Sequence, residues 1–301
     1  IKDRRLGRVT RVEVEQEHSE FLLGEMLKRW SLEKSDIFVK QSILDFTCFW
    51  QILKHSDFKG KMAVNPPVVA PLGLKSVHIG DIFETMKRGD ILLHHPYNNF
   101  EPVIQLLEQA ADDPNVLAIK ITLYRISKNS RISNALFRAA EQGKHVSVLF
   151  EVKARFDEEN NLYWSNRLRE HGAKVVYGLQ GLKVHSKLLQ ISLKRERHED
   201  LITYVGSGNF NEKTSRIYGD LALLTGNPSI GREVKKVFRL LENSYDRGVF
   251  QHLIVSPFKD STRAPSEPKV TMRNFTCSRI SRSLQPVFWI ASANSYSFKN
   301  R

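Results

Sequence analysis

The feature that most limits the possible folds is a regular alternation of helix and strand patterns between residues 101 and 178. Each helix pattern has apolar residues on one face, and each strand pattern is a short, largely apolar run. In chain order the segments are Glu101–Ala111, Val116–Thr122, Ile132–Gln142, His145–Val152, Glu158–His171 and Lys174–Tyr177. A helix before each strand predicts an α/β domain, in which a mostly parallel sheet is flanked by helices.

Further patterns extend this domain toward the C-terminus. Strands are predicted at His185–Leu193, Leu201–Val205 and Asp220–Leu224, and a last amphipathic helix at Ser229–Tyr245. Before the alternation, residues 1–71 mix short strand and helix patterns and run into the proline-rich stretch Asn65–Gly73. Because proline and glycine interrupt regular structure, we place a domain boundary near residue 71.

Charge and cysteine content restrict the partners and the compartment. The 301 residues include 46 Lys+Arg against 33 Asp+Glu, and the formal net charge is +13. A surplus of this size usually indicates a polyanionic partner, such as nucleic acid, a phosphate polymer or an anionic membrane. The two cysteines exclude a disulfide scaffold and a four-cysteine zinc site, and they fit a reducing cytoplasm. No apolar stretch approaches the roughly 20 residues that a membrane-spanning helix needs.

The segment Ala264–Arg301 differs from the rest of the chain in composition. It is rich in serine, arginine and asparagine, has no clear apolar period and contributes +5 to the formal charge. Such a composition predicts a loosely structured tail. A second interpretation is that this segment is not the natural continuation of the gene.

The first chemical motif is Gly181-Leu-Lys-Val-His-Ser-Lys187. Residues two apart in a strand point the same way, so His185 and Lys187 are expected to project from one face of the predicted strand. A neutral imidazole is a nucleophile that can attack phosphorus, and a neighbouring ammonium can draw the phosphoryl oxygens. The ordinary alternative is a half-exposed strand that carries two polar residues by chance.

The second motif, Gly206-Ser-Gly-Asn-Phe-Asn211, follows a predicted strand. Two glycines at a strand end can leave backbone N–H groups free to form an anion-binding nest. Asn209 and Asn211 can donate to a phosphoryl oxygen or orient a histidine, whereas the ordinary alternative is a simple glycine turn. Together, the two motifs resemble the half-site of the phospholipase D superfamily, whose members form a covalent phosphohistidine.

Longer motifs in register narrow this resemblance to one family. They are His94–Pro102, Leu117–Arg125, Val152–Glu158, Gly181–Lys187 and Gly206–Thr214. In this order they resemble the bacterial polyphosphate kinases, which make long-chain polyphosphate from ATP, and the resemblance covers about residues 1–258. The superfamily usually has Asp five positions after the lysine of the first motif. Ser192 stands at that position here. The polyphosphate kinases also lack this Asp, so the departure counts against a phospholipase rather than against a kinase.

The resemblance assigns roles to four residues. His185 matches the histidine that becomes phosphorylated, and Tyr218 matches a tyrosine that contacts the nucleotide. Arg125 and Arg155 match two arginines of the magnesium–phosphate site. Since a guanidinium has no free lone pair, we expect these arginines to bind phosphate oxygens while phosphate and water hold Mg²⁺. Otherwise, Arg125 would be a solvated residue, Arg155 an ion-pair partner of nearby acids, and Tyr218 a packing residue.

Three further assignments come from chemistry and spacing. We predict that Lys187 is catalytic and that Asn209 and Arg216 bind phosphate. The resemblance implies reversible transfer of the ATP γ-phosphate to polyphosphate through a phosphohistidine, with Mg²⁺ required. It further implies that the partners are ATP, ADP and inorganic polyphosphate rather than nucleic acid. A homo-oligomer is expected in the cytoplasm, where it could also associate peripherally with the inner face of the membrane. Two alternatives stay open: a phospholipase D-like nuclease or phosphodiesterase, and a non-catalytic module that binds polyanions.

The resemblance also predicts the domain organisation. Residues 1–71 are expected to be the C-terminal part of an α+β head domain, and residues 72–252 the first phospholipase D-like catalytic domain. Residues 253–301 would hold the truncated start of a second α/β domain, followed by the basic tail. The second domain should supply another histidine, yet no histidine follows His252. We therefore expect a fragment that is inactive on its own.

Overall fold

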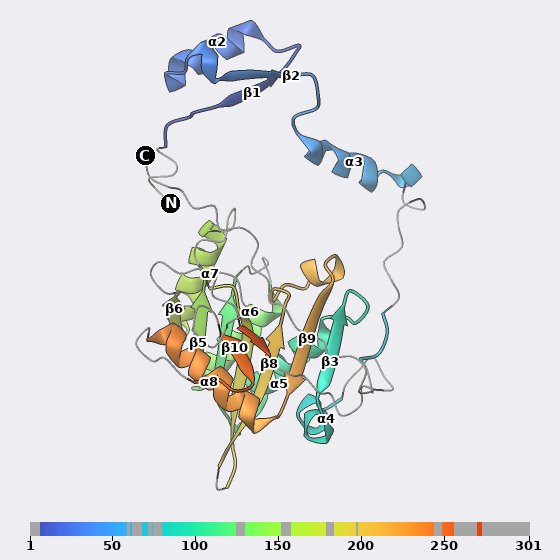
Figure 1. Ribbon diagram of the computed structural model, residues 1–301, viewed down its shortest axis with the longest axis vertical. Coiled ribbons are helices and arrows are strands. Elements are labelled where there is room, and N and C mark those ends of the chain that lie inside the picture. The colour runs from blue at the N-terminus through green and yellow to red at the C-terminus, as the bar shows by residue number, and fades with distance from the viewer. Residues whose placement is uncertain are drawn as a thin grey trace. The chain divides into compact units, whose positions relative to one another are not determined.

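The computed structural model describes most of the chain, and two compact units are present, Ile1–Asn65 and Pro66–Arg301 (Figure 1). The described residues are 7–58, 61, 68–71, 74, 80–124, 130–151, 158–178, 184–196, 198–243, 249–255 and 270–272. None of the described helices is long and apolar enough to cross a membrane. The assignment of these units to a head domain and to catalytic domains stays a prediction.

The N-terminal unit contains a small β-α-β arrangement. Strand β1 (Val12–Glu15) pairs in parallel with β2 (Ile37–Lys40), and helix α2 (Glu20–Trp30) connects them. Ser19 begins α2 because its side chain accepts a hydrogen bond from the backbone N–H of Leu22. The unit continues through a short helix, α3 (Phe49–Lys54).

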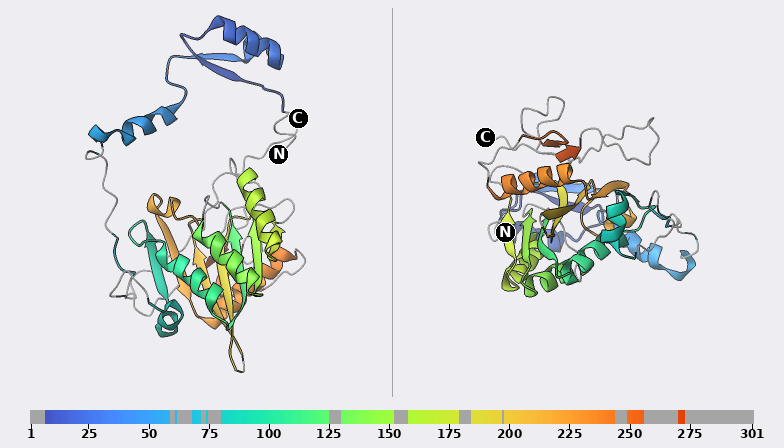
Figure 2. Two further views of the ribbon diagram at one scale, coloured as in Figure 1. Left: turned by 180° about the vertical axis from the view of Figure 1, so that it is seen from behind. Right: turned by 90° about the horizontal axis from the view of Figure 1, so that it is seen from below.

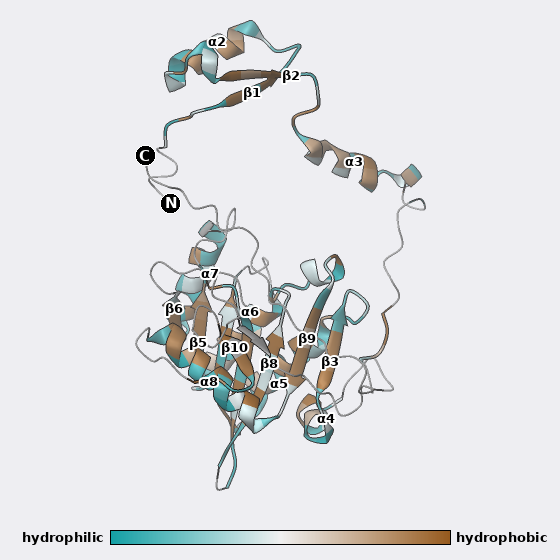
Figure 3. Cartoon of the chain, in the orientation of Figure 1, coloured by the Kyte–Doolittle hydropathy of each residue, from teal (hydrophilic) through white to brown (hydrophobic). Residues whose placement is uncertain are grey.

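The second unit is built on a seven-stranded sheet with the order β3-β9-β8-β7-β4-β5-β6. The strands are β3 (Ile91–His95), β4 (Val116–Leu123), β5 (His145–Phe150), β6 (Lys174–Tyr177), β7 (Lys187–Lys194), β8 (Glu199–Gly206) and β9 (Asp220–Thr225). Figure 3 shows hydrophobic residues along its strands, as expected for a sheet covered on both faces. A separate antiparallel pair joins β10 (Leu253–Val255) to β11 (Val270–Met272).

The directions of the strands confirm part of the sequence prediction and correct another part. Strands β4, β5 and β6 are parallel, as the alternation of helices and strands indicates. The other four pairings, from β3 through β9, β8 and β7 to β4, are antiparallel. The fold is α/β as predicted, but the whole sheet is mixed rather than mostly parallel. The reason is that β7, β8 and β9 follow one another without crossover helices, and such strands pair antiparallel.

Helices cover both faces of this sheet. They are α4 (Ile82–Arg88), α5 (Glu101–Asp112), α6 (Arg131–Glu141), α7 (Glu158–Glu170) and α8 (Pro228–Glu242). Helices α5, α6 and α7 lie on one face and α8 on the other (Figure 2, right). The core is divided accordingly: Leu189 packs with the α5–α7 side, whereas its neighbour Leu188 packs with Val234 and Phe238 of α8. Each fully buried side chain of this size contributes about 1.5–3 kcal/mol to folding.

Two glycines end helices where the sequence predicts them. Gly143 has φ of 80°, and the backbone N–H of Lys144 donates to Ala139 O, which closes α6. Gly172 has φ of 87°, and the N–H of Ala173 donates to Leu168 O at the end of α7. These left-handed conformations are easily adopted only by glycine. The capping role predicted for Asp157 at the start of α7 lies outside the described residues.

Candidate phosphoryl-transfer site

The first motif is brought together as the sequence predicts, although by a different geometry. His185 lies two residues before β7 rather than inside a strand, and Lys187 is the first residue of β7. The Lys187 side chain is buried, and its Nζ lies 2.7 Å from His185 Nδ1 and donates to His185 O at 2.6 Å. The Lys187 side chain therefore turns back and contacts His185 directly, whereas the sequence predicts two side chains that project in parallel from one face of a strand.

The pairing of β7 with β8 places the second motif next to the first. Lys187 is the Cα partner of Gly206, the first residue of Gly206-Ser-Gly-Asn. Beyond Gly206 the loop is fixed by Ser207, whose Oγ donates to Asp220 Oδ1 at 2.7 Å and accepts from the N–H of Leu221 at 3.0 Å. Two motifs that are separate in the sequence thus meet at one end of an antiparallel hairpin.

The glycines of this loop serve close packing rather than a left-handed turn. Neither Gly206 nor Gly208 has a positive φ. A Cβ on Gly206 would lie 2.4 Å from Tyr204 Oη, and one on Gly208 would lie 2.5 Å from Asp220 Oδ2. The structure therefore gives these two glycines a packing role, and the binding of an anion by the backbone N–H groups of the loop stays a prediction.

The remaining predicted residues of the loop differ in their surroundings. The side-chain Oδ1 of Asn209 is buried and accepts no hydrogen bond from any described residue, so it can accept one from another group. Asn211 instead stabilises the loop, since its Oδ1 accepts the N–H groups of Lys213 and Thr214. Arg216 is exposed in the short helix Thr214–Arg216. Tyr218 is 61% exposed, so it does not pack into the core of this unit.

Arg125 and Arg155 lie outside the described residues, and their predicted roles are not tested. The residue before Arg125 is close to the site: the ring of Tyr124 meets the His185 ring edge-on, with 5.3 Å between centroids. Lys187 Nζ lies 5.7 Å from the same tyrosine ring. The C-terminal end of β4 therefore lies close to His185.

Several buried polar residues around the site were not identified from the sequence. Thr122 and Glu151 hydrogen-bond the backbone on either side of His185. Tyr204 is fully buried behind the glycine loop, and burial together with the charge of Asp220 raises the pKa of its phenol. Glu151 directly follows the largely apolar run His145–Phe150. A charged residue at the end of such a strand is the sequence signal that could have indicated it.

The described residues around His185 offer few protein ligands for a magnesium ion. Among the described residues, no group of three or more His, Cys, Asp or Glu side chains could hold a metal ion. The carboxylates of Glu151 and Asp220 already accept hydrogen bonds from Val184 and Ser207. Mg²⁺ prefers to keep water and phosphate oxygens as ligands. These residues therefore fit a magnesium ion that arrives already bound to the nucleotide phosphates. They fit less well an ion that protein side chains alone would hold.

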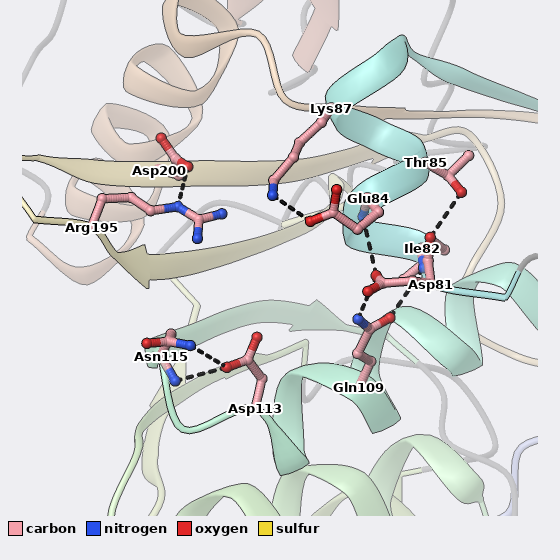
Figure 4. A network of polar contacts seen from close by, with 10 residues as sticks. All are labelled: Asp81, Ile82, Glu84, Thr85, Lys87, Gln109, Asp113, Asn115, Arg195 and Asp200. Atoms are coloured by element: carbon pink, nitrogen blue, oxygen red, sulfur yellow. Dashed lines mark hydrogen bonds and ion pairs between the residues drawn. The ribbon is translucent and has the colours of Figure 1, made fainter.

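A cavity of about 400 Å³ lies at the opposite end of the sheet from His185. Strand β7 runs away from the histidine to Lys194, and the cavity is bordered there by Arg195, Asp200 and the end of α4. Figure 4 shows the polar contacts of this region, including the 2.6 Å pair between Arg195 Nε and Asp200 Oδ2. None of the predicted site residues that the structure describes lines this cavity, and the ion pair between Arg195 and Asp200 stabilises the β7–β8 turn.

Comparison with known proteins gives a consistent result. A family model described as polyphosphate kinase C-terminal domain 1 matches residues 81–247. The chain is 38% identical over 259 residues to a polyphosphate kinase of Bacillus anthracis, covering 86% of this chain and 37% of that protein. It is 47% identical over 175 residues to the Escherichia coli K12 polyphosphate kinase, covering 58% of this chain and 25% of that protein.

A solved structure extends the similarity to the fold. The crystal structure of polyphosphate kinase from Porphyromonas gingivalis superimposes with a TM-score of 0.66 and 31% sequence identity, covering 82% of this chain and 38% of that one. The chain thus spans little more than a third of the length of such relatives. Since the family model covers more than half of the chain and the fold agrees, the chain belongs to the polyphosphate kinase family.

Proposed function

We propose that this chain carries the phosphoryl-accepting part of a polyphosphate kinase site, with His185 as the nucleophile. The observation that carries the proposal is the convergence of both motifs at one end of the β7–β8 hairpin. Lys187 contacts His185 Nδ1 and is at the same time paired with Gly206. A histidine next to a buried ammonium and a polar loop is suited to bind and attack a phosphoryl group.

The proposed reaction has two reversible transfers. A ring nitrogen of His185 attacks the γ-phosphorus of ATP, an N–P bond forms, and the bond to the β–γ bridging oxygen breaks with the electron pair leaving on ADP. A terminal oxygen of polyphosphate then attacks the same phosphorus, the N–P bond breaks, and the histidine is restored. Both steps depend mainly on positioning and charge neutralisation.

The contact between Lys187 and His185 restricts which nitrogen reacts. An ammonium that donates to Nδ1 leaves the proton of a neutral ring on Nε2, where it would block attack. A nucleophilic Nε2 therefore requires the proton on Nδ1, and the ammonium must then leave this nitrogen. We infer that arriving phosphoryl oxygens draw the Lys187 ammonium away from Nδ1, which frees a ring lone pair for the attack.

The other predicted residues would bind the substrate. Arg125, Arg155 and Arg216 would neutralise phosphate oxygens, Asn209 would hydrogen-bond the transferred group, and the exposed ring of Tyr218 would contact the nucleotide. Mg²⁺ would enter with ATP and offset the charge of its phosphates. We further propose ATP, ADP and polyphosphate as partners, a homo-oligomer and a cytoplasmic location.

Incubation with γ-labelled ATP tests this proposal. We expect acid-labile label on the wild-type chain and none on His185→Ala. We expect little steady-state turnover, because the chain spans only 37% of the length of its Bacillus anthracis relative. Label that is acid-stable and independent of His185 would refute the assignment, and nucleotide release from DNA without ATP would favour the nuclease instead.

A further inference from the structure

We propose that Glu151 is a positioning residue that holds the backbone segment carrying His185, so that the imidazole keeps its place at the start of β7. The inference rests on the function proposed above for His185, but its geometry is independent of it. Strands β4 and β7 are paired up to Ile121 and Leu189. Beyond this pair, β8 still pairs with Lys187 and Leu188. On the β4 side, side chains rather than the strand ladder hold the segment 184–188.

Glu151 makes the first of these attachments. It follows β5, its backbone N–H donates to Leu123 O at 3.0 Å, and its side chain is only 6% exposed. Oε2 of its carboxylate accepts the N–H of Val184, the residue before His185, at 2.8 Å. A hydrogen bond to a charged acceptor is about twice as strong as a neutral one, so this contact fixes the backbone at Val184 firmly.

Thr122 makes the second attachment on the other side of the histidine. Its Oγ1 donates to Ser186 O at 2.7 Å and accepts the N–H of Leu188 at 3.0 Å. His185 is therefore held between a carboxylate at residue 184 and a hydroxyl at residues 186 and 188. If one of these attachments is lost, the peptide at His185 can move relative to β7.

Asn161 of α7 joins the two strand ends that bear these attachments. Its Nδ2 donates to Tyr124 O at 2.9 Å and to Glu151 O at 3.2 Å, and its side chain is buried. The ring of Tyr124 packs edge-on against that of His185. The Glu151 backbone is thus tied to the strand that also supports the histidine ring, and a change at residue 151 is transmitted to His185 through short, buried contacts.

Substitutions at Glu151 can be compared with a matched control on the other face of the sheet. Glu233 of α8 is equally buried, and its carboxylate accepts backbone N–H groups from Gln251, His252 and Leu253. We would prepare Glu151→Ala, Glu151→Gln, Glu233→Ala and Glu233→Gln in the full chain. For each, we would measure stability by urea denaturation, the rate at which diethyl pyrocarbonate modifies His185 (by peptide mass spectrometry), and label transferred from ATP.

We expect Glu151→Ala to change the modification rate of His185 and to lower its labelling by about 10²-fold, the effect of a misplacement near 1 Å. Glu151→Gln keeps an oxygen acceptor for Val184, so its labelling loss should stay within about tenfold. The Glu233 variants should lose stability while His185 behaves as in the wild type.

The proposal is overturned if both Glu151 variants leave the reactivity of His185 unchanged, or if the Glu233 variants alter it equally. If Glu151→Ala does not fold, Glu151→Gln should still lower labelling of His185 more than Glu233→Gln does, and equal labelling of these two variants overturns the proposal. Absence of label on the wild-type chain would refute the proposed function instead. The modification rates would still decide whether Glu151 positions the histidine.

Discussion

Replacing Gly208 by Ala tests whether close packing, rather than backbone freedom, requires glycine in the loop beside His185. An ideal Cβ at this position would lie 2.5 Å from Oδ2, 2.7 Å from Cγ and 3.0 Å from Cβ of Asp220. Rotation of the carboxylate can relieve only the first two contacts. The Cβ of Asp220 is fixed by the backbone of β9, which begins at this residue.

The expected magnitude follows from two opposing effects. Overpacking of this kind typically costs about 1–3 kcal/mol. Displacement of Asp220 also weakens the 2.7 Å hydrogen bond that its carboxylate accepts from Ser207 Oγ. Gly→Ala substitutions gain about 0.4–1 kcal/mol because the unfolded chain loses freedom. The net loss should be about 1–2 kcal/mol, which corresponds to a fall in Tm of about 2–8 °C for a domain of this size.

Urea denaturation followed by far-UV circular dichroism measures this loss, and Gly219→Ala is the matched control. Gly219 lies next to Asp220, has no positive φ, and a Cβ there would meet nothing within 4 Å. It should therefore be neutral or slightly stabilising. A second variant, Asp220→Ala, should couple to Gly208→Ala by about 0.5–3 kcal/mol in a double-mutant cycle. Equal effects of the two glycine substitutions, or no coupling to Asp220, would refute the reasoning.

Three further outcomes are expected. Burial alone would raise the pKa of Glu242, but bonds from Lys120 at 2.9 Å and Lys174 at 3.2 Å outweigh it and lower the pKa. The resulting stability is fully present above the ordinary value of 4.5 and is lost as the pH falls through the lower folded value. The difference in urea midpoint between wild type and Glu242→Gln should therefore shrink below that pH, and a constant difference would contradict this. Leu107→Ala should cost about 2–5 kcal/mol in the same assay, whereas Leu117→Ala, at an exposed site, should stay within about 0.5 kcal/mol. Lys187→Met should lower labelling of His185 by at least about 10²-fold, and labelling at the wild-type rate would exclude the ammonium from the reaction.

The sequence predicts the elements of the fold better than their pairing. Strand β6 has the predicted bounds, and α5 ends one residue after its predicted end. Periodicity reports which face of a segment is buried, and in this unit that information suffices to locate helices and strands. Periodicity does not report whether a strand runs parallel or antiparallel to its neighbours. The antiparallel pairing of β4 with β7 depends on contacts between distant segments, so the mixed character of the sheet could not be derived from the pattern.

The candidate site shows the same division. The residue types of the two motifs indicated His185, Lys187 and the glycine loop as candidates. However, the inward turn of Lys187 onto His185 O depends on the histidine lying just before the strand, where alternation no longer applies. The support from Thr122 and Glu151 comes from strands that precede the histidine by many residues. Only the folded chain brings those side chains to the backbone at His185.

The mixed sheet also explains how one end of the unit can gather this chemistry. Parallel strands β4 and β5 both end beside the His185 segment, where Tyr124 and Glu151 follow them. Strand β7 begins at the same end because it runs antiparallel to β4, and β8 ends there because it returns from β7. A fully parallel sheet would place Lys187 at the opposite end from Gly206, since Lys187 begins its strand and Gly206 ends its own. The antiparallel hairpin is therefore what places the histidine motif and the glycine loop side by side.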